Sequence, residues 1–185
     1  MGDEVPYDAR SIANHVLNIR DFIGLTTTQL DLQKIVFFCH SAYLHRTRGP
    51  LVKGYFEAWQ HGPVHATIYR DFKVSGDKPI SHRARKKDLV TGNSTDFPDI
   101  TDTEVKRHLH EHVSALSALS TWQLVERSHA PRGPWAKTVY KGRTDVAFGL
   151  RIDDATILEC HRFQGLHDLG LDGAGRYEVS RFATD

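Results

Sequence analysis

Two histidines one helical turn apart have a spacing that could bind a metal ion. His108 and His112 are four residues apart, which places both imidazoles on one side of a helix and suits zinc. Glu104, one further turn towards the N-terminus, could be a third ligand. Apolar residues occupy the core-facing side of the same helix, so we expect the histidines on a partly exposed flank. We therefore predict no metal site, and a His-ligated metal-dependent enzyme is the least favoured alternative.

Motifs for nucleophilic catalysis and phosphate binding are missing from the sequence. Neither Cys39 nor Cys160 lies in a catalytic signature, and no Gly-x-Ser-x-Gly elbow occurs. The glycine-rich residues 170–175 follow no predicted strand and precede no predicted helix, so they do not fit a phosphate loop. We predict that the protein is not an enzyme and has no cofactor.

Aromatic and turn residues gather around one Gly-Pro pair and at a later tryptophan. Large rings are favoured anchors of protein interfaces because they bury much area with few rotatable bonds. The same rings also build small cores, so each has a structural interpretation as well. The candidate partner-binding residues are Phe56, Trp59, His61, Gly62, Pro63, Val64, Tyr69 and Trp135.

The elements that must position these residues are mostly helices. Apolar side chains recur at helical intervals along most of the chain. Thr28 with Asp31, and Thr101 with Glu104, have the spacing of a capping box, and Pro63 suits the first position of a helix. The predicted helices cover about residues 8–23, 28–48, 63–75, 101–116 and 153–163, with a short one near 122–125.

Strands are predicted to be few and short. Residues 55–59 are rich in aromatic side chains and favour a strand, and a second strand is possible near residues 79–80. Residues 81–98 show no periodicity and predict a long mobile loop, and residues 130–134 a loop leading to Trp135. The predicted fold class is mostly α (α+β): a single compact helical domain with a short β-hairpin or strand pair. This domain covers residues 1–165, and residues 166–185 form a loosely packed tail.

Charge and composition indicate which kinds of partner the protein is not expected to bind. The 24 basic and 23 acidic residues give a formal net charge of +1, which argues against a broad nucleic-acid surface. The one basic cluster, residues 82–87, is followed at once by Asp88 and is interpreted as a solvated loop. Two scattered cysteines, an acidic N-terminus and the lack of an apolar stretch of about 20 residues predict a cytoplasmic protein without a membrane partner.

Three sequence blocks resemble one protein family. Residues 32–38, LQKIVFF, resemble the "LQKLLYF" opening of the Panacea domain found in SocA-like antitoxins. Residues 56–64, FEAWQHGPV, followed by Ile68 and Tyr69, are similar to its "FEAW-x-x-GPV" block. Residues 128–135 are similar to its "H-x-x-x-SPW" segment, with Gly133 where serine is usual. The blocks keep their order and are distributed over most of residues 12–135.

This resemblance implies a mostly helical antitoxin of a bacterium or phage that neutralises a cognate protein toxin by direct binding. It also raises an alternative, a proteolytic adaptor that delivers the toxin to the ClpXP protease. The predicted partners are therefore the toxin and, under the alternative, ClpXP. The motif positions carried over from the family are expected to define the fold as well as to contact a partner.

Overall fold

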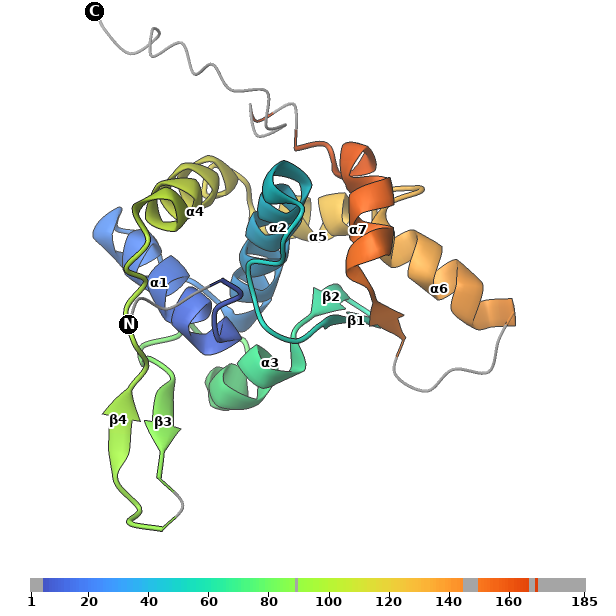
Figure 1. The fold of residues 1–185 in the computed structure, drawn as a ribbon. Helices are drawn as coiled ribbons and strands as arrows, with labels where there is room; N and C mark the ends of the chain where they lie inside the picture. Colours follow the sequence, from blue (N-terminus) through green and yellow to red (C-terminus); the bar gives the residue numbers. More distant parts are fainter. Residues whose placement is uncertain (1–4, 89, 145–149, 167–168, 170–185) are drawn as a thin grey trace, which may run out of the picture.

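Helix α2 (Gln29–Thr47) runs through the centre of the molecule, and most of the other helices pack against it (Figure 1). The computed structural model describes residues 5–88, 90–144, 150–166 and 169. All of residues 29–44 except Leu30 are buried, as expected of a helix enclosed on every side. The predicted capping box is present: Thr28 Oγ1 accepts from the Asp31 amide, and Asp31 Oδ2 accepts from the Thr28 amide. Over the described residues the fold is mostly α-helical, and the predicted fold class is confirmed.

Two groups of helices flank α2 (Figure 1). Helices α1 and α4 pack on one side of it, and α5, α6 and α7 lie towards the other, with α3 beside the strands. The helices are α1 (Ala9–Phe22), α3 (Ala66–Phe72), α4 (Thr103–Leu116), α5 (Thr121–Ser128), α6 (Pro134–Thr144) and α7 (Asp154–Cys160), with 3-10 turns η1 (Lys73–Ser75) and η2 (His161–Gln164). None of the described helices combines the length and the apolar character needed to cross a membrane.

The start of α4 differs from the prediction. Asp102, not Thr101, is the capping residue, and its carboxylate accepts from the amides of Glu104 and Val105 at 2.8 and 3.0 Å. The Glu104 side chain pairs with Arg107 instead of returning to the cap. The N-cap of α4 was therefore predicted one residue too early and the predicted capping box was wrong, because the Asp102 carboxylate accepts from two amides alone.

A three-stranded antiparallel sheet lies between α3 and α6. Strand β1 (Phe56–Trp59) pairs with β2 (Gly62–Val64) and with β5 (Arg151–Ile152), in the order β2-β1-β5. Pro63 was predicted to open a helix, but it lies opposite Ala58 in β2, and α3 begins only at Ala66. A proline is tolerated there because β2 is an edge strand of this sheet.

Two further predictions about strands were wrong. Residues 79–80 form no strand, and Ile80 makes a single backbone hydrogen bond to Thr27. The predicted loop at residues 81–98 instead contains a hairpin of β3 (Arg85–Lys87) and β4 (Ser94–Asp96), which projects from the body (Figure 1). All six strand residues are exposed, so no alternation of apolar and polar side chains could reveal them.

The C-terminal part adds elements that were not predicted. Helix α6 begins at Pro134, the last residue of the predicted loop at residues 130–134. Strand β5 precedes α7, which Asp153 caps as predicted. Of the predicted tail, residues 166–185, the structure describes only Leu166 and Leu169. Leu166 is buried in the core, and Leu169 packs against it. The rest of the tail lies outside the described residues, and the domain boundary at residue 165 stays a prediction.

Candidate partner-binding site

Two side chains of α2 hydrogen-bond the backbone in and directly after β2, the strand that follows the turn between β1 and β2. Gln33 Oε1 accepts a hydrogen bond from the His65 amide at 2.8 Å, and Lys34 Nζ donates to the Pro63 carbonyl oxygen at 2.8 Å. Both side chains come from the first of the three motif blocks, and both reach the second. The first two blocks therefore meet in space as one structural unit.

The Lys34 ammonium is buried inside the protein. The residue is fully buried, and no described carboxylate forms an ion pair with it. Loss of hydration lowers the pKa of Lys34 to about 7. Its Nζ lies against Gly62, whose φ is +98° and where an added Cβ would come within 3.0 Å of Nζ and still closer to Ser128 Oγ. Only a glycine fits this position without displacing one of them.

The third block holds the same turn from the other side. Trp135, in the first turn of α6, donates from Nε1 to the Trp59 carbonyl oxygen at 2.8 Å. His129 Nε2, at the end of α5, lies 3.2 Å from the Gln60 carbonyl oxygen. The His129 and Trp135 rings meet edge to face with centroids 4.0 Å apart. The turn is thus held between α2 and the α5–α6 junction.

An open groove borders this turn, and we call it the Trp59 groove. The rings of Trp59 and Tyr69 lie side by side with centroids 4.8 Å apart, and they are 37% and 36% exposed. The groove has a volume of about 320 Å³ and a mostly apolar lining. Its lining residues are Gln29, Leu30, Gln33, Trp59, Gln60, His61, Val64, Tyr69, Gly76 and Asp77.

The eight candidate residues divide into two groups. Four line the Trp59 groove: Trp59, His61, Val64 and Tyr69. The other four support it: Phe56, Gly62, Pro63 and Trp135. Phe56 is buried and packs edge to face on Phe37 with centroids 5.1 Å apart.

Sequence reasoning missed several lining residues, among them Leu30 and Asp77. Leu30 had a usable signal, because it is apolar yet lies outside the periodic positions assigned to the core.

The histidine pair on α4 is not on an exposed flank, which corrects the prediction. His108 and His112 are both buried, and their ring centroids lie 3.9 Å apart. His108 Nε2 lies 2.9 Å from the Cys39 carbonyl oxygen of α2. Burial, with a smaller contribution from the neighbouring His112, lowers the pKa of His108 to about 3. Helix α4 therefore buries a wider face against α2 than its apolar residues alone indicate.

Metal binding receives no support from the described part of the chain. Glu104, the possible third ligand, pairs with Arg107. Within residues 5–88, 90–144, 150–166 and 169, no three side chains of His, Cys, Asp or Glu are grouped so that they could hold a metal ion.

The comparison with protein families agrees with this arrangement of motifs. The family model described as "Antitoxin SocA-like, Panacea domain" matches residues 32–136, which run from the first turn of α2 into the first turn of α6. All eight candidate residues fall inside this match. The chain belongs to the SocA-like antitoxin family with a Panacea domain.

A curated relative extends the match beyond this region. The chain is similar to the protein named Antitoxin SocA from Caulobacter vibrioides (strain NA1000 / CB15N), with 36% identity over 162 residues. The alignment covers 88% of this chain and 86% of that protein, so it spans nearly all of both. No solved structure matches the chain.

Proposed function

We propose that the chain neutralises a cognate protein toxin by binding it directly at the Trp59 groove. The observation that carries this proposal is the pair of partly exposed rings, Trp59 and Tyr69. They lie beside a turn that is held by α2, by the end of α5 and by the start of α6. Truncating a buried aromatic anchor at an interface costs about 2 kcal/mol or more. A pair of such anchors at an open groove is the arrangement expected of a partner-binding surface.

The groove is organised before a partner arrives. Trp135 holds the Trp59 backbone, and the Trp59 indole donates to Glu57 Oε2 at 2.7 Å. Gln29 on α2 donates to the Tyr69 carbonyl oxygen at 2.9 Å. Rings held in this way lose little freedom on binding, so more of the contact energy contributes to affinity.

The rim of the groove suits a protein partner. Gln29, Gln60, His61 and Asp77 surround the apolar centre and offer both donors and acceptors. Protein interfaces combine an apolar centre with a polar rim in this way.

Two side chains with strongly lowered pKa values, Lys34 and His108, are fully buried and hydrogen-bond backbone carbonyl oxygens. This favours neutralisation by contact over catalysis.

A rescue experiment tests the proposal. The product of the adjacent gene is the candidate toxin, and it is co-expressed with the wild-type chain, with Tyr69→Ala, or with Trp122→Ala. Trp122 is the matched control, because its ring is 74% exposed on α5 and does not line the groove. We expect wild type and Trp122→Ala to restore growth, and Tyr69→Ala to restore it poorly while melting within a few degrees of wild type. Full rescue by folded Tyr69→Ala contradicts the groove as the binding site.

The same strains distinguish direct neutralisation from delivery to ClpXP. In cells that lack the protease, direct binding predicts that rescue persists at an unchanged toxin level. Loss of rescue there, with accumulation of toxin, would assign the chain to the adaptor mechanism instead.

A further inference from the structure

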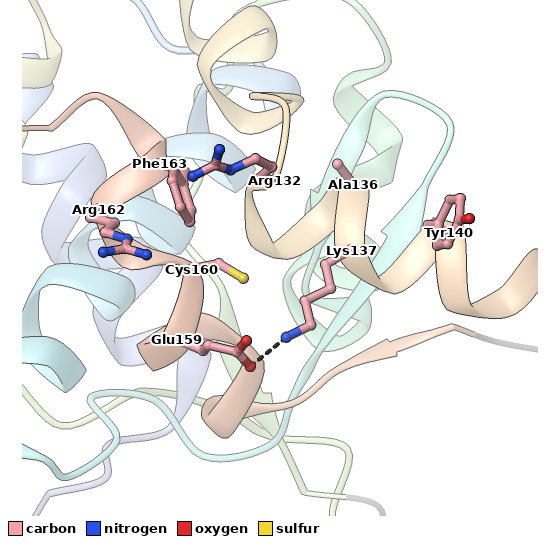
Figure 2. A pocket seen from close by; sticks show the side chains of 8 residues that line it. All are labelled: Arg132, Ala136, Lys137, Tyr140, Glu159, Cys160, Arg162 and Phe163. Atoms are coloured by element: carbon pink, nitrogen blue, oxygen red, sulfur yellow. Dashed lines mark ion pairs between the residues drawn. The ribbon is translucent and has the colours of Figure 1, made fainter.

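A second groove lies between α6 and α7, and its walls carry an unbalanced positive charge (Figure 2). It has a volume of about 580 Å³ and does not include any residue of the Trp59 groove. Ala136, Cys160 and the Phe163 ring form its apolar part. We call it the Phe163 groove.

Two arginines from different segments meet at one ring in this groove. The Cζ atom of Arg132 lies 4.2 Å from the Phe163 ring centroid, and that of Arg162 lies 4.7 Å from it. Arg132 comes from the loop before α6 and Arg162 from η2, and Figure 2 shows them on either side of the ring. Both residues are exposed, so their guanidinium groups are accessible to a partner. The ring thus brings two like charges close together.

No described carboxylate balances these two charges. Among the described residues that line the groove, Glu159 is the one acidic residue, and it forms an ion pair with Lys137 (Figure 2). Neither Arg132 nor Arg162 has an ion pair within the described residues. Two neighbouring cations repel each other, and a bound anion relieves this repulsion. A guanidinium also matches a carboxylate in shape, because it can donate two parallel hydrogen bonds.

The backbone at Arg132 supports a binding role. Its φ is +66°, in the left-handed region that is unfavourable for any residue with a Cβ. The glycine next to it, Gly133, does not have a positive φ. The chain therefore places an arginine where a glycine would cost less. Such conformations are retained more often at ligand-binding sites than elsewhere.

We propose that the Phe163 groove binds an acidic segment of the toxin. Its carboxylates pair with Arg132 and Arg162, and a neighbouring apolar side chain packs on Ala136 and the exposed Tyr140 ring. This inference rests on the proposed function, and it adds the chemistry of the partner. A protein segment is favoured over nucleic acid because both arginines already stack on Phe163, where a base would need a free ring face.

Both grooves share one supporting segment. Arg132 reaches the Phe163 groove, and Trp135, three residues later, holds the Trp59 backbone. A toxin that binds both grooves therefore contacts the protein on both sides of the segment 132–135.

A binding titration with purified toxin tests this inference. Wild type is compared with Arg132→Ala/Arg162→Ala and with Lys86→Ala/Lys87→Ala, at low and high salt. The second variant is the matched control, because it also removes two exposed positive charges, but on the hairpin away from α6 and α7 (Figure 1). We expect the arginine variant to weaken binding on the order of tenfold or more and to reduce its salt dependence. The lysine variant should bind like wild type.

The possible failures are distinguishable. If wild type binds and the folded arginine variant binds within about twofold of it, the inference is overturned and the proposed function stands. If wild type does not bind the toxin, the proposed function fails and this inference fails with it. If the alanine variant does not fold, Arg132→Gln/Arg162→Gln replaces it. The same tenfold loss is then expected, because glutamine keeps a short aliphatic stem and a polar end but removes the charge.

Discussion

The Lys34 ammonium donates to the Pro63 carbonyl oxygen at 2.8 Å, which ties the buried centre of α2 to the edge strand of the small sheet. The two residues belong to separate motif blocks and are 29 positions apart. Because the buried Lys34 side chain lies against Gly62, a larger residue at position 62 would displace Lys34. The first two motif blocks of the family therefore have a structural role, because together they hold the turn between β1 and β2 in place.

Because of Lys34, the free energy of unfolding should rise as the pH is raised above 7. Its pKa is lowered from 10.5 to about 7 in the folded protein, whereas the unfolded chain keeps the ordinary value. Between these values the unfolded chain binds more protons, so the free energy of unfolding rises with pH. The rise is up to about 1.4 kcal/mol per pH unit for one group. Urea denaturation from pH 7 to 9 should show this rise in wild type relative to Lys34→Met. Parallel pH curves for the two proteins would contradict a lowered Lys34 pKa.

Gly62 should tolerate alanine less well than another glycine with positive φ. Gly24 has a φ of +77° but no atom within 4 Å of an added Cβ, so Gly24→Ala costs backbone strain alone, about 1–2 kcal/mol. Gly62→Ala carries the same strain and also meets Ser128 and Lys34. Overpacking of this kind adds about 1–3 kcal/mol. Urea denaturation of both variants measures the difference, and equal losses would show that the turn is not tightly packed.

The Trp135 hydrogen bond should contribute measurably to stability and to toxin binding. Trp135→Phe keeps an aromatic ring but removes the donor to the Trp59 carbonyl oxygen, at a cost of about 1 kcal/mol. Trp122→Phe is the control, since its ring is largely exposed on α5. We expect weaker binding and lower stability for Trp135→Phe only. Equal stability and equal toxin affinity of Trp135→Phe and Trp122→Phe would show that the Trp135 hydrogen bond does not hold the turn.

The buried histidines should make the protein sensitive to acid. The pKa of His108 is lowered from 6.5 to about 3 in the folded state, so below pH 6.5 the unfolded chain takes up a proton that the folded chain does not. Stability therefore falls as pH falls from 6.5 towards 3, by up to about 1.4 kcal/mol per unit. His108→Gln keeps a donor for the Cys39 carbonyl oxygen but does not titrate. Its loss of stability between pH 6.5 and 4.5 should be smaller, and an equally steep loss would contradict the prediction.

Helices with a single apolar face or a clear cap were predictable from the sequence. The other elements depend on tertiary packing, which the sequence pattern does not show. Apolar side chains at helical intervals in residues 8–23 indicated α1, and Thr28 with Asp31 indicated the start of α2. The turn at Pro63 was misread, because a proline suits an edge strand as well as a helix start.

The candidate site was predictable in its residue types but not in its geometry. The motif named Trp59 and Tyr69, but their shared groove depends on how β1 and α3 pack. His108 is buried because its ring meets the Cys39 carbonyl oxygen, 69 positions away, and no local pattern shows such a contact. Helix α6 was missed because a loop containing glycine and proline precedes it and Gly142 lies within it.

Hydroxyl-radical footprinting of the purified toxin complex tests the central claim most directly. The method reports the solvent access of individual aromatic side chains, and Trp122, 74% exposed and outside the groove, is an internal standard. We predict that oxidation of Trp59 and Tyr69 falls sharply on binding while that of Trp122 does not change. Oxidation of Trp59 and Tyr69 at the rate of the free protein, in a complex shown to be intact, would contradict the account.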